Sequence, residues 1–541
     1  MRGTCRTFWG FARFLDRATE ELGNVIRNEY RIMNGTLGET QRQRLLAAQN
    51  EFFSLSLDEV LSRHQRRSPQ QAVLALFHEV VATVPAYAAF LNAQGIDPAA
   101  VRTVAEFERL PLTNKPDYLR RYPLAELCRG GRLENCDFVA VSSGSTGEPG
   151  FWPRFVSDEY AIARRFEQVF DDSFQADRRR TLAVVCFSLG TWVGGMFTAA
   201  CCRHLAAKGY PITTITPGHH PEEIFRVLER LAPAFEQVVL LGYPPFLKDV
   251  VDRGIARGLD WSRFAVKLVF AGEVFSEEWR ELVHERVGAR SIHHDSASLY
   301  GTADAGVLGN ETPLSICIRR YLAANPAAAR ALFGESRLPT LVQYDPLSRY
   351  FECVDGTLLF SGDNGIPLIR YHIADRGGLI PYPAMRRFLA DWHFDPVATL
   401  RAHAPEAPLR GVRELPFVYV FGRADFTVSY FGANIYPENV SVGLEQPGVR
   451  EWTTGKFVLQ VQEDADRNRR WSIMIELAPN ESASESRRRA ATDAILTHLV
   501  RLNSEFAHYV PAEYRIPQVK LLPTGDPTYF PSGVKHRYTR R

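Results

Sequence analysis

VKLVFAGE (residues 266–273) is an apolar run that ends in Ala-Gly-Glu, and it is the third of a series. TLAVVCFSLG (181–190) and QVVLLGYPP (237–245) precede it, separated by segments with helical spacing such as PEEIFRVLERLAP (221–233). Buried strands that alternate with amphipathic helices indicate a parallel sheet with crossover helices. The series therefore predicts an α/β fold.

The regions on either side of this series have different patterns. Residues 1–110 are mainly helical in pattern, and 340–420 hold short strand-like pieces around Asp-Gly and Gly-Asp turns. Beyond Gly422, two strand patterns and a helical pattern over 484–503 predict a small α+β domain. We predict a helical N-terminal extension (1–70), a large domain with mixed and parallel sheets plus a β module (71–421), a hinge (422–425) and a small mobile C-terminal domain (426–541).

The bulk composition is that of a globular protein. The chain has 541 residues, 45% hydrophobic and 23% charged, with a formal net charge of +2. A near-balanced charge argues against a nucleic-acid partner. Eight scattered cysteines without a C-x-x-C favour reduced thiols and a cytoplasmic location. Charges interrupt the apolar residues of the N-terminus, and no segment approaches the roughly 20 apolar residues of a membrane span. We expect neither a signal peptide nor a membrane partner.

Five dispersed stretches carry residues suited to a nucleotide. VSSGSTGEPG (141–150) follows an apolar strand, and its small residues and backbone N–H groups suit an anion. The tail of FAGE (270–273) marks a strand end, where ligands of open parallel sheets bind. In SASLYGTADAG (296–306), Tyr300 offers a plane for a base, Thr302 a hydroxyl for phosphate and Asp304 a carboxylate for Mg²⁺. Each stretch, taken alone, is also an ordinary loop or turn.

The fourth stretch and a final pair of segments lie later in the chain. Asp375, in IPLIRYHIADRGGL (366–379), has two oxygens that can accept hydrogen bonds from a ribose. FGRADFTVSYFGANIYPENV (421–440) and PSGVKHRYTRR (531–541) frame the predicted small domain. Each of these segments also has an ordinary interpretation. Asp375 could have a structural role, 421–440 could be a charged hinge, and 531–541 could be a glycine-containing tail with a lone lysine. The pair His293–His294 suits no standard metal-ligand spacing.

In their order and separation, these stretches resemble the adenylate-forming superfamily of acyl-CoA synthetases, adenylation domains and luciferases. FAGEVFSEEWRE (270–281) and LIRYHIADRGGL (368–379) are similar to segments of its phenylacetate–CoA ligase and capsule-biosynthesis-type branch. The lead-in GIDPAAVRTVAEFERLPLTNKPDYLRRYPL (95–124) also resembles that branch, and the likeness runs from about residue 70 to the end.

The resemblance implies a role for each matched position. The phosphate loop is Ser142, Ser143, Gly144, Ser145, Thr146 and Gly147; the adenine and ribose positions are Gly272, Glu273, Tyr300, Gly301 and Asp375. Thr302 meets the α-phosphate, Arg423 lies near the phosphate or the ribose, and Asp304 is associated with Mg²⁺. Asp425 is the hinge, Gly432 admits a pantetheine arm and Lys535 is the catalytic lysine. Asp304 replaces the family's glutamate, and Val534 separates Gly533 from Lys535, where the family has Gly-Lys.

The resemblance further implies an ATP-dependent acid–thiol ligase that forms an acyl-adenylate and transfers the acyl group, with coenzyme A as the expected acceptor. An amine or a carrier-protein thiol remains open as the acceptor, and so does a catalytically silent nucleotide-binding relative. Phe187, Trp192, Gly194 and Tyr243 are the expected acyl pocket, and their aromatic rings favour an aromatic acid. The expected cofactors are ATP/AMP, Mg²⁺ and coenzyme A.

Overall fold

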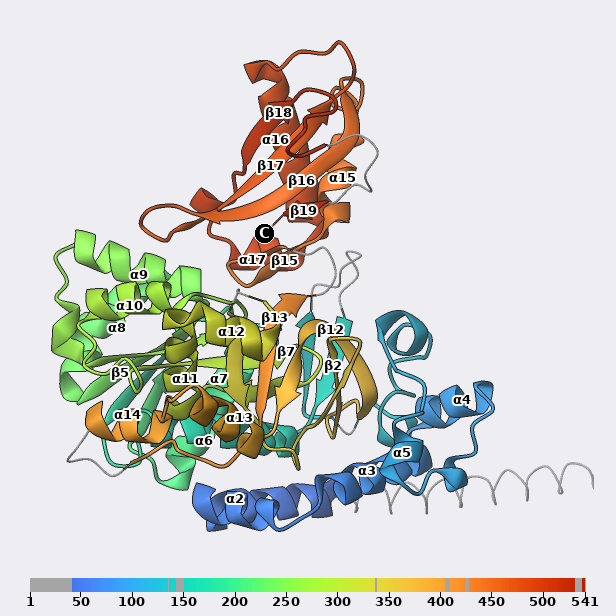
Figure 1. The fold of residues 1–541 in the computed structure, drawn as a ribbon, viewed down its shortest axis with the longest axis vertical. Helices are drawn as coiled ribbons and strands as arrows, with labels where there is room; N and C mark the ends of the chain where they lie inside the picture. The colour runs from blue at the N-terminus through green and yellow to red at the C-terminus, as the bar shows by residue number, and fades with distance from the viewer. Residues whose placement is uncertain are drawn as a thin grey trace, which may run out of the picture.

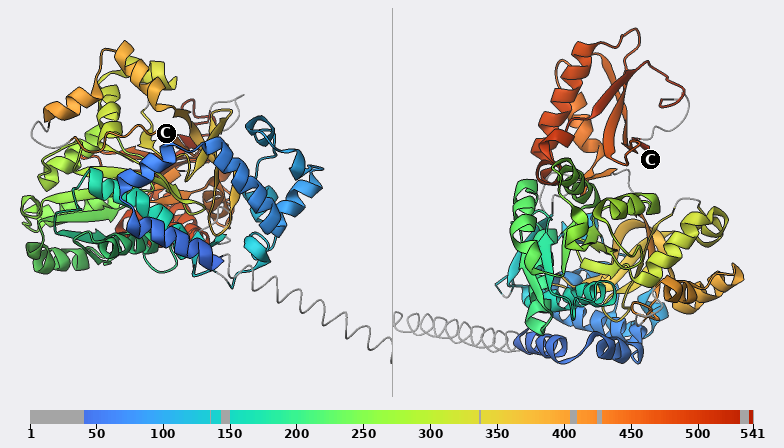
Figure 2. Two further views of the ribbon diagram at one scale, coloured as in Figure 1. Left: turned by 90° about the horizontal axis from the view of Figure 1, so that it is seen from below. Right: turned by 90° about the vertical axis from the view of Figure 1, so that its left-hand side faces the viewer.

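The structure, a computed structural model, describes residues 41–134, 136–142, 150–335, 338–403, 409–423, 428–530 and 538–540. Two units stand out in it: a broad α/β body and a smaller unit built by the C-terminal part of the chain (Figure 1). The right-hand view in Figure 2 shows the smaller unit seated on one end of the body.

An 11-stranded mixed sheet forms the centre of the body, in the order β10-β11-β12-β13-β9-β8-β7-β6-β5-β3-β4. Strands β4, β3, β5, β6 and β7 pair in parallel, while the strands from β8 to β13 pair antiparallel. The α/β prediction is confirmed. The β module predicted over 340–420 continues the same sheet. Its strands are β3 Thr181–Val185, β4 Ile212–Ile215, β5 Gln237–Gly242, β6 Val266–Ala271, β7 Ser296–Thr302, β8 Gly306–Asn310, β9 Thr340–Gln343, β10 Tyr350–Val354, β11 Thr357–Gly362, β12 Leu368–Ile380 and β13 Phe417–Arg423.

Crossover helices join the parallel strands, as the sequence pattern predicts (Figure 1). Ser276 caps one of them, α10, by accepting a hydrogen bond from the Trp279 N–H at 3.1 Å. The helices of the body are α2 Leu57–Gln65, α3 Pro69–Thr83, α4 Pro85–Ala93, α5 Val104–Phe107, α6 Val156–Asp172, α7 Val193–Lys208, α8 Pro221–Leu231, α9 Pro244–Ala256, α10 Glu277–Val287, α11 Pro313–Ala324, α12 Pro326–Phe333, α13 Tyr382–Asp391 and α14 Pro396–His403. Short helical turns are η1 Pro98–Ala100, η2 Lys115–Leu119, η3 Arg129–Gly131, η4 Ala232–Ala234 and η5 Trp261–Phe264.

The hairpin β1 Phe138–Ser142 and β2 Gly150–Arg154 holds both ends of the serine-rich segment. Ser142 and Gly150 are partners in its antiparallel register. Residues 143–149, which join the two strands, lie outside the described residues. The hairpin lies next to Trp192, whose backbone forms a bridge with Val141 of β1.

The smaller unit has a four-stranded sheet in the order β18-β17-β16-β19 and a separate hairpin, β14–β15. Its elements are β14 Val428–Tyr430, β15 Ala433–Ile435, α15 Pro437–Leu444, β16 Thr453–Glu463, β17 Arg469–Leu477, α16 Glu485–Leu502, α17 Ser504–Tyr509, η6 Ala512–Tyr514, β18 Gln518–Leu522 and β19 Thr539–Arg540. The two predicted strands and the predicted helix over 484–503 correspond to β16, β17 and α16. Its mobility stays a prediction.

Residues 41–65 pack along the body. Residues 41–54 are helical, and the ring of Phe52 is buried. The guanidinium of Arg164 lies 4.9 Å from the centroid of that ring and donates to the Leu55 carbonyl at 3.2 Å. His64 Nδ1 lies 2.7 Å from the buried carboxylate of Asp345. The described part of the extension is thus joined to the body by both apolar and polar contacts.

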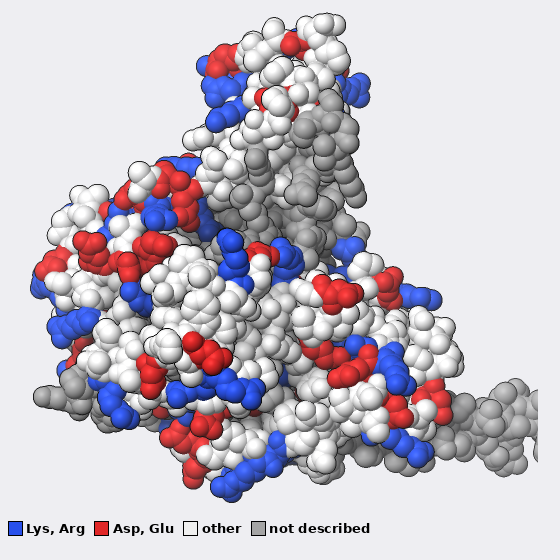
Figure 3. Space-filling model, in the orientation of Figure 1, with Lys and Arg blue, Asp and Glu red and all other residues white. Residues whose placement is uncertain are grey.

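The surface carries both signs of charge over the whole visible face, with no large patch of one sign (Figure 3). Among the described residues, no single helix has the length and hydropathy to cross a membrane. The bent pair α3–α4, which turns by 97°, passes that test by length and composition alone. The seven described cysteines form no disulfide.

Candidate active site

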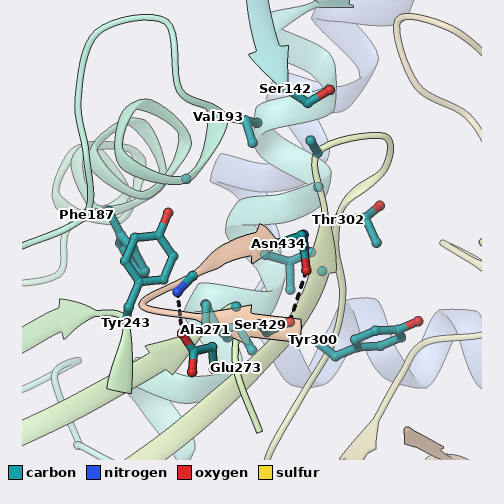
Figure 4. A pocket seen from close by; sticks show the side chains of 18 of the residues that line it. Ser142, Phe187, Val193, Tyr243, Ala271, Glu273, Tyr300, Thr302, Ser429 and Asn434 are labelled. Atoms are coloured by element: carbon teal, nitrogen blue, oxygen red, sulfur yellow. Dashed lines mark hydrogen bonds between the residues drawn. The ribbon is translucent and has the colours of Figure 1, made fainter. Parts of the chain in front are cut away.

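A cavity of about 300 Å³ lies where the body meets the smaller unit (Figure 4). It opens beyond the carboxyl ends of β6 and β7, where ligands of open parallel sheets bind. Most of the residues singled out in the sequence line this one cavity. They are Ser142, Phe187, Gly194, Tyr243, Gly272, Glu273, Tyr300, Gly301, Thr302, Asp304, Asp375 and Gly432.

Tyr300 and Asp375 meet at one end of the cavity. The Tyr300 hydroxyl donates to Asp375 Oδ2 at 2.7 Å, and both side chains are buried. They come from β7 and β12, and the sheet order brings these distant segments close together. Asp375 also pairs in register with Arg423 of β13. An aromatic face beside a carboxylate suits a nucleoside, because the ring can stack on a base while the oxygens accept from a ribose.

The turn after β7 holds Thr302 and Asp304, and buried arginines fix its backbone. Arg154 Nη2 donates to the carbonyls of Ala303 at 2.5 Å and Asp304 at 3.0 Å. From the other side, Arg349 Nη2 donates to the Ala305 carbonyl at 3.1 Å. These contacts leave the Thr302 hydroxyl at the cavity, where it accepts the Ala305 N–H at 3.2 Å.

The carboxylate of Asp304 is the metal ligand that the resemblance implies. Oδ2 accepts from the Tyr371 hydroxyl at 2.5 Å, and Oδ1 lies 3.5 Å from Lys115 Nζ. No group of three or more His, Cys, Asp or Glu that could hold a metal occurs in the described part of the chain. Mg²⁺ at nucleotide sites is commonly bound through one or two carboxylates and the phosphates themselves. The carboxylate of Asp304 fits such an ion as its protein ligand.

Aromatic rings form the other end of the cavity. Phe187 meets Tyr243 edge to face at a centroid distance of 4.9 Å (Figure 4). The ring of Tyr509 of α17 lies 5.0 Å from that of Tyr243. Trp192 differs from the prediction: it is not among the described lining residues and packs behind the wall, 5.0 Å from the ring of Tyr509. A Cβ on Gly194 would come no nearer than 3.7 Å to a neighbouring atom, the Tyr243 hydroxyl oxygen.

The smaller unit contributes lining residues that sequence reasoning missed: Ser429, Asn434, Tyr436, Glu505 and Tyr509. Ser429 Oγ donates to Asn434 Oδ1 at 3.0 Å, and the Asn434 N–H donates to Glu505 Oε2 at 3.1 Å. Of this unit, Gly432 and Lys535 were expected near the ligand, and Lys535 lies outside the described residues. The segment FGANIYPEN (431–439) could have indicated this contribution to the cavity, because it follows the predicted hinge and mixes aromatic and amide side chains.

Glu273 connects the two units. Its Oε1 accepts the backbone N–H of Gly432, and its Oε2 accepts from Arg469 Nη1. Arg469 Nη2 donates in addition to the carbonyl of Val274. Burial raises the pKa of the Glu273 carboxyl, although Arg469 and the Gly432 N–H oppose that shift. We call Glu273, Gly432 and Arg469 the interdomain clamp.

Several predicted residues fall outside the described residues: Ser143 to Gly147, Asp425 and Lys535. For Arg423, the backbone is described as the last residue of β13, and the side chain is not. Their predicted roles stay predictions.

His293 packs inside the body, 5.0 Å from the ring of His403 and away from the described cavity lining. Burial is the chief cause of a lowered pKa at four histidines: it lowers the pKa of His219 to about 4 and that of His284 and His293 to about 3, and it also lowers the pKa of His294. Neither ring nitrogen of His284 has a hydrogen-bond partner among the described residues. These rings are therefore buried in their neutral form.

Acid is expected to destabilise the protein through these histidines. The unfolded chain binds protons near pH 6.5 and the folded chain only near pH 3 to 4, so stability falls as the pH drops through that window. As the pH falls from 7 to 5, the wild type should lose about 2 kcal/mol more unfolding free energy than His284→Leu does. Urea titration at each pH measures this difference. His78→Leu, at an exposed position of α3, is the control. A difference that does not change with pH would contradict this assignment.

No protein-family model matches the chain. A phenylacetate–coenzyme A ligase of Thermus thermophilus is 23% identical over 391 residues, covering 71% of this chain and 76% of that protein. A phenylacetate–coenzyme A ligase of Aromatoleum evansii is also 23% identical, over 56% of this chain and 64% of that one.

Among solved structures, a 2-hydroxyisobutyryl-CoA ligase in complex with 2-HIB-AMP and CoA, in the thioesterification state, superposes with a TM-score of 0.59. It is 18% identical, and the match covers 87% of this chain and 89% of that one. This likeness shows the fold. The chain is therefore similar in sequence to phenylacetate–coenzyme A ligases, and it shares the fold of the 2-hydroxyisobutyryl-CoA ligase.

Proposed function

We propose that the protein is an ATP-dependent carboxylic acid ligase that forms an acyl-adenylate and then transfers the acyl group to coenzyme A. The observation that carries the proposal is the cavity of about 300 Å³ at the junction of the two units. It brings Tyr300, Asp375, Thr302 and Asp304 together with an apolar aromatic wall. Its curated relatives carry names for the same chemistry.

In the first half-reaction, an oxygen of the acid's carboxylate attacks the α-phosphorus of ATP, and the bond to the bridging oxygen breaks, releasing pyrophosphate. The physical obstacle is repulsion between two anions. The acid is already ionised at neutral pH, so no general base is needed. In our proposal Tyr300 and Asp375 hold the nucleoside, and Thr302 meets the α-phosphate. Asp304, together with the phosphates, would hold Mg²⁺, which would supply positive charge when bound.

In the second half-reaction, the thiol sulfur attacks the acyl carbon and AMP leaves. Gly432 lines the cavity next to Tyr243, which supports an arrangement in which the smaller unit shapes the path of the thiol. We further propose that rotation at Asp425 exchanges this arrangement with one in which Lys535 reaches the α-phosphate. This proposal divides the chain into an N-terminal extension (1–70), a large domain (71–421), a hinge (422–425) and a small C-terminal domain (426–541).

The aromatic wall of Phe187, Tyr243 and Tyr509 favours a planar or aromatic acid over a long alkyl acid. A cytoplasmic location stays a prediction. The alternative acceptor is an amine or a carrier-protein thiol. The test is pyrophosphate exchange over a panel of aryl and alkyl acids, followed by mass spectrometry with CoA, a carrier protein or an amine as acceptor. Exchange and a CoA thioester with an aryl acid are expected. ATP binding without exchange on any acid would instead indicate a silent nucleotide-binding relative.

The interdomain clamp should act on the second half-reaction alone. Arg469→Ala leaves the Glu273 carboxylate without its cation, which disfavours the observed arrangement of the units. We expect thioester formation from a supplied acyl-adenylate to fall about tenfold, since one charged hydrogen bond is worth roughly 1.5–3 kcal/mol before solvent screening. Exchange should stay within about twofold. Arg470→Ala, at the exposed neighbouring position of β17, is the control; equal losses in both half-reactions would contradict the assignment.

A further inference from the structure

The described lining of the cavity is markedly short of positive charge. Glu273, Asp304, Asp375 and Glu505 contribute carboxylates, and Lys115 is the only Lys or Arg side chain among the described lining residues. The serine-rich segment 143–149 contains neither Lys nor Arg and includes Glu148. A triphosphate brings several further negative charges, and cations usually offset them.

The backbone before Lys115 is tied to β12. Thr113 is buried; its N–H donates to the Arg370 carbonyl at 3.1 Å, and its own carbonyl accepts the His372 N–H at 2.8 Å. Its hydroxyl donates to the carbonyl of Ile369 at 2.8 Å. Asn114 then caps the turn η2 by accepting the Asp117 N–H at 2.7 Å. Lys115 thus starts from a fixed point on the sheet that also carries Asp375.

The ammonium of Lys115 lies between two predicted phosphate-binding elements. Nζ is 3.5 Å from Asp304 Oδ1 and 5.9 Å from the ring centroid of Trp152. Trp152 Nε1 in turn donates to Ser142 Oγ at 2.9 Å, at the start of the serine-rich segment. The Lys115 side chain keeps 33% of its surface exposed, whereas that of Asp304 keeps 6%. A partly exposed ammonium beside a buried carboxylate can turn toward an incoming anion.

We propose that Lys115 is the cation that binds the β- and γ-phosphates of ATP and stabilises the pyrophosphate as it leaves. The proposal rests on the proposed function and deepens it. As the α-phosphorus bonds to the acid oxygen, the electron pair of the broken bond passes to pyrophosphate, and the Lys115 ammonium lies against that growing charge. No proton transfer is required. Lys115 supplies positive charge that the other described lining residues do not provide.

The test compares ATP with AMP, because only ATP has the phosphates that Lys115 is proposed to meet. By calorimetry with magnesium and a non-hydrolysable ATP analogue, Lys115→Gln should bind the analogue about thirtyfold more weakly. AMP affinity should stay within about twofold, and Lys115→Arg should recover most of the loss. The acid-dependent exchange rate should fall in parallel with the analogue affinity. Thioester formation from a supplied acyl-adenylate, which contains no pyrophosphate, should be unchanged.

Matched controls separate this role from a structural one. Lys456→Gln removes a lysine that pairs with Glu476 in the smaller unit at 3.2 Å and should change neither affinity. Equal weakening of analogue and AMP would mean that Lys115 acts by positioning Asp304, and it would overturn the proposal, as would unchanged analogue affinity. Thermal unfolding of each variant checks the fold. Failure of the wild type to bind either nucleotide would instead count against the proposed function.

Discussion

Gly432→Val is expected to slow acyl transfer to the thiol about 100-fold and to leave acid-dependent pyrophosphate exchange within about twofold. A Cβ at this position would lie 2.5 Å from Cδ1 and Cε1 of Tyr243, where van der Waals contact needs more than 3.4 Å. The clash exists only while the smaller unit is seated on the body. The clash therefore destabilises only the arrangement of the two units that is proposed for thiol transfer.

Backbone strain must be separated from this clash, because Gly432 has φ +83°. Gly448 provides the matched control: its φ is +86°, and a Cβ there would have no atom within 4 Å. Gly448→Val should lower the unfolding free energy as Gly432→Val does and spare both half-reactions. Adding Tyr243→Ala to Gly432→Val should restore part of the thiol transfer relative to Tyr243→Ala alone. Equal effects of the two glycine variants on transfer would exclude the contact as the cause.

Lys535→Ala is expected to lower acid-dependent pyrophosphate exchange about 300-fold, within the range found when one transition-state donor is removed. The resemblance assigns this lysine to the α-phosphate during adenylation. In the proposed cycle it is absent from the cavity during thiol transfer, so conversion of a supplied acyl-adenylate to the thioester should continue at the wild-type rate. The two half-reactions are measured separately, by exchange of labelled pyrophosphate and by mass spectrometry of the thioester.

Lys520→Ala, at an exposed position of β18, is the control for loss of a lysine from the same unit. If Lys535→Ala adenylates normally, the catalytic lysine is assigned wrongly. Arg537 would then be the next cation to replace, because Val534 shifts the tail by one position against the family pattern.

Local patterns predicted the elements well, because they depend on neighbours in the chain. The apolar runs around 181–190, 237–245 and 266–273 became β3, β5 and β6, and the helical pattern over 484–503 became α16. The Asp-Gly turn at 355–356 joins β10 to β11, as its residues indicated. Tyr300 and Asp375 could also be singled out in the sequence, because each lies in a segment that matches a pattern of the resembled family.

Contacts between distant segments could not be read in the same way. Trp192 was expected to face the acid because it lies near Phe187 in the chain, yet Tyr509, more than 300 positions later, stands in front of it. Lys115 lay in a segment noted only for its resemblance, and its place beside Asp304 depends on the bridge between Thr113 and Tyr371. The residue pattern of each segment gives no indication of the distant segment that it contacts.

The sequence by itself determined the α/β class, the order of the elements and the residue types able to hold a nucleotide, since burial patterns and side-chain chemistry are properties of short stretches. Only the tertiary structure decided which of those residues share a cavity, that Glu273 joins the two units through Arg469, and that a lysine from near the N-terminal helices supplies the described positive charge. Such contacts are set by the register of an 11-stranded sheet and by the seating of one unit on another, and these depend on the packing of the whole chain.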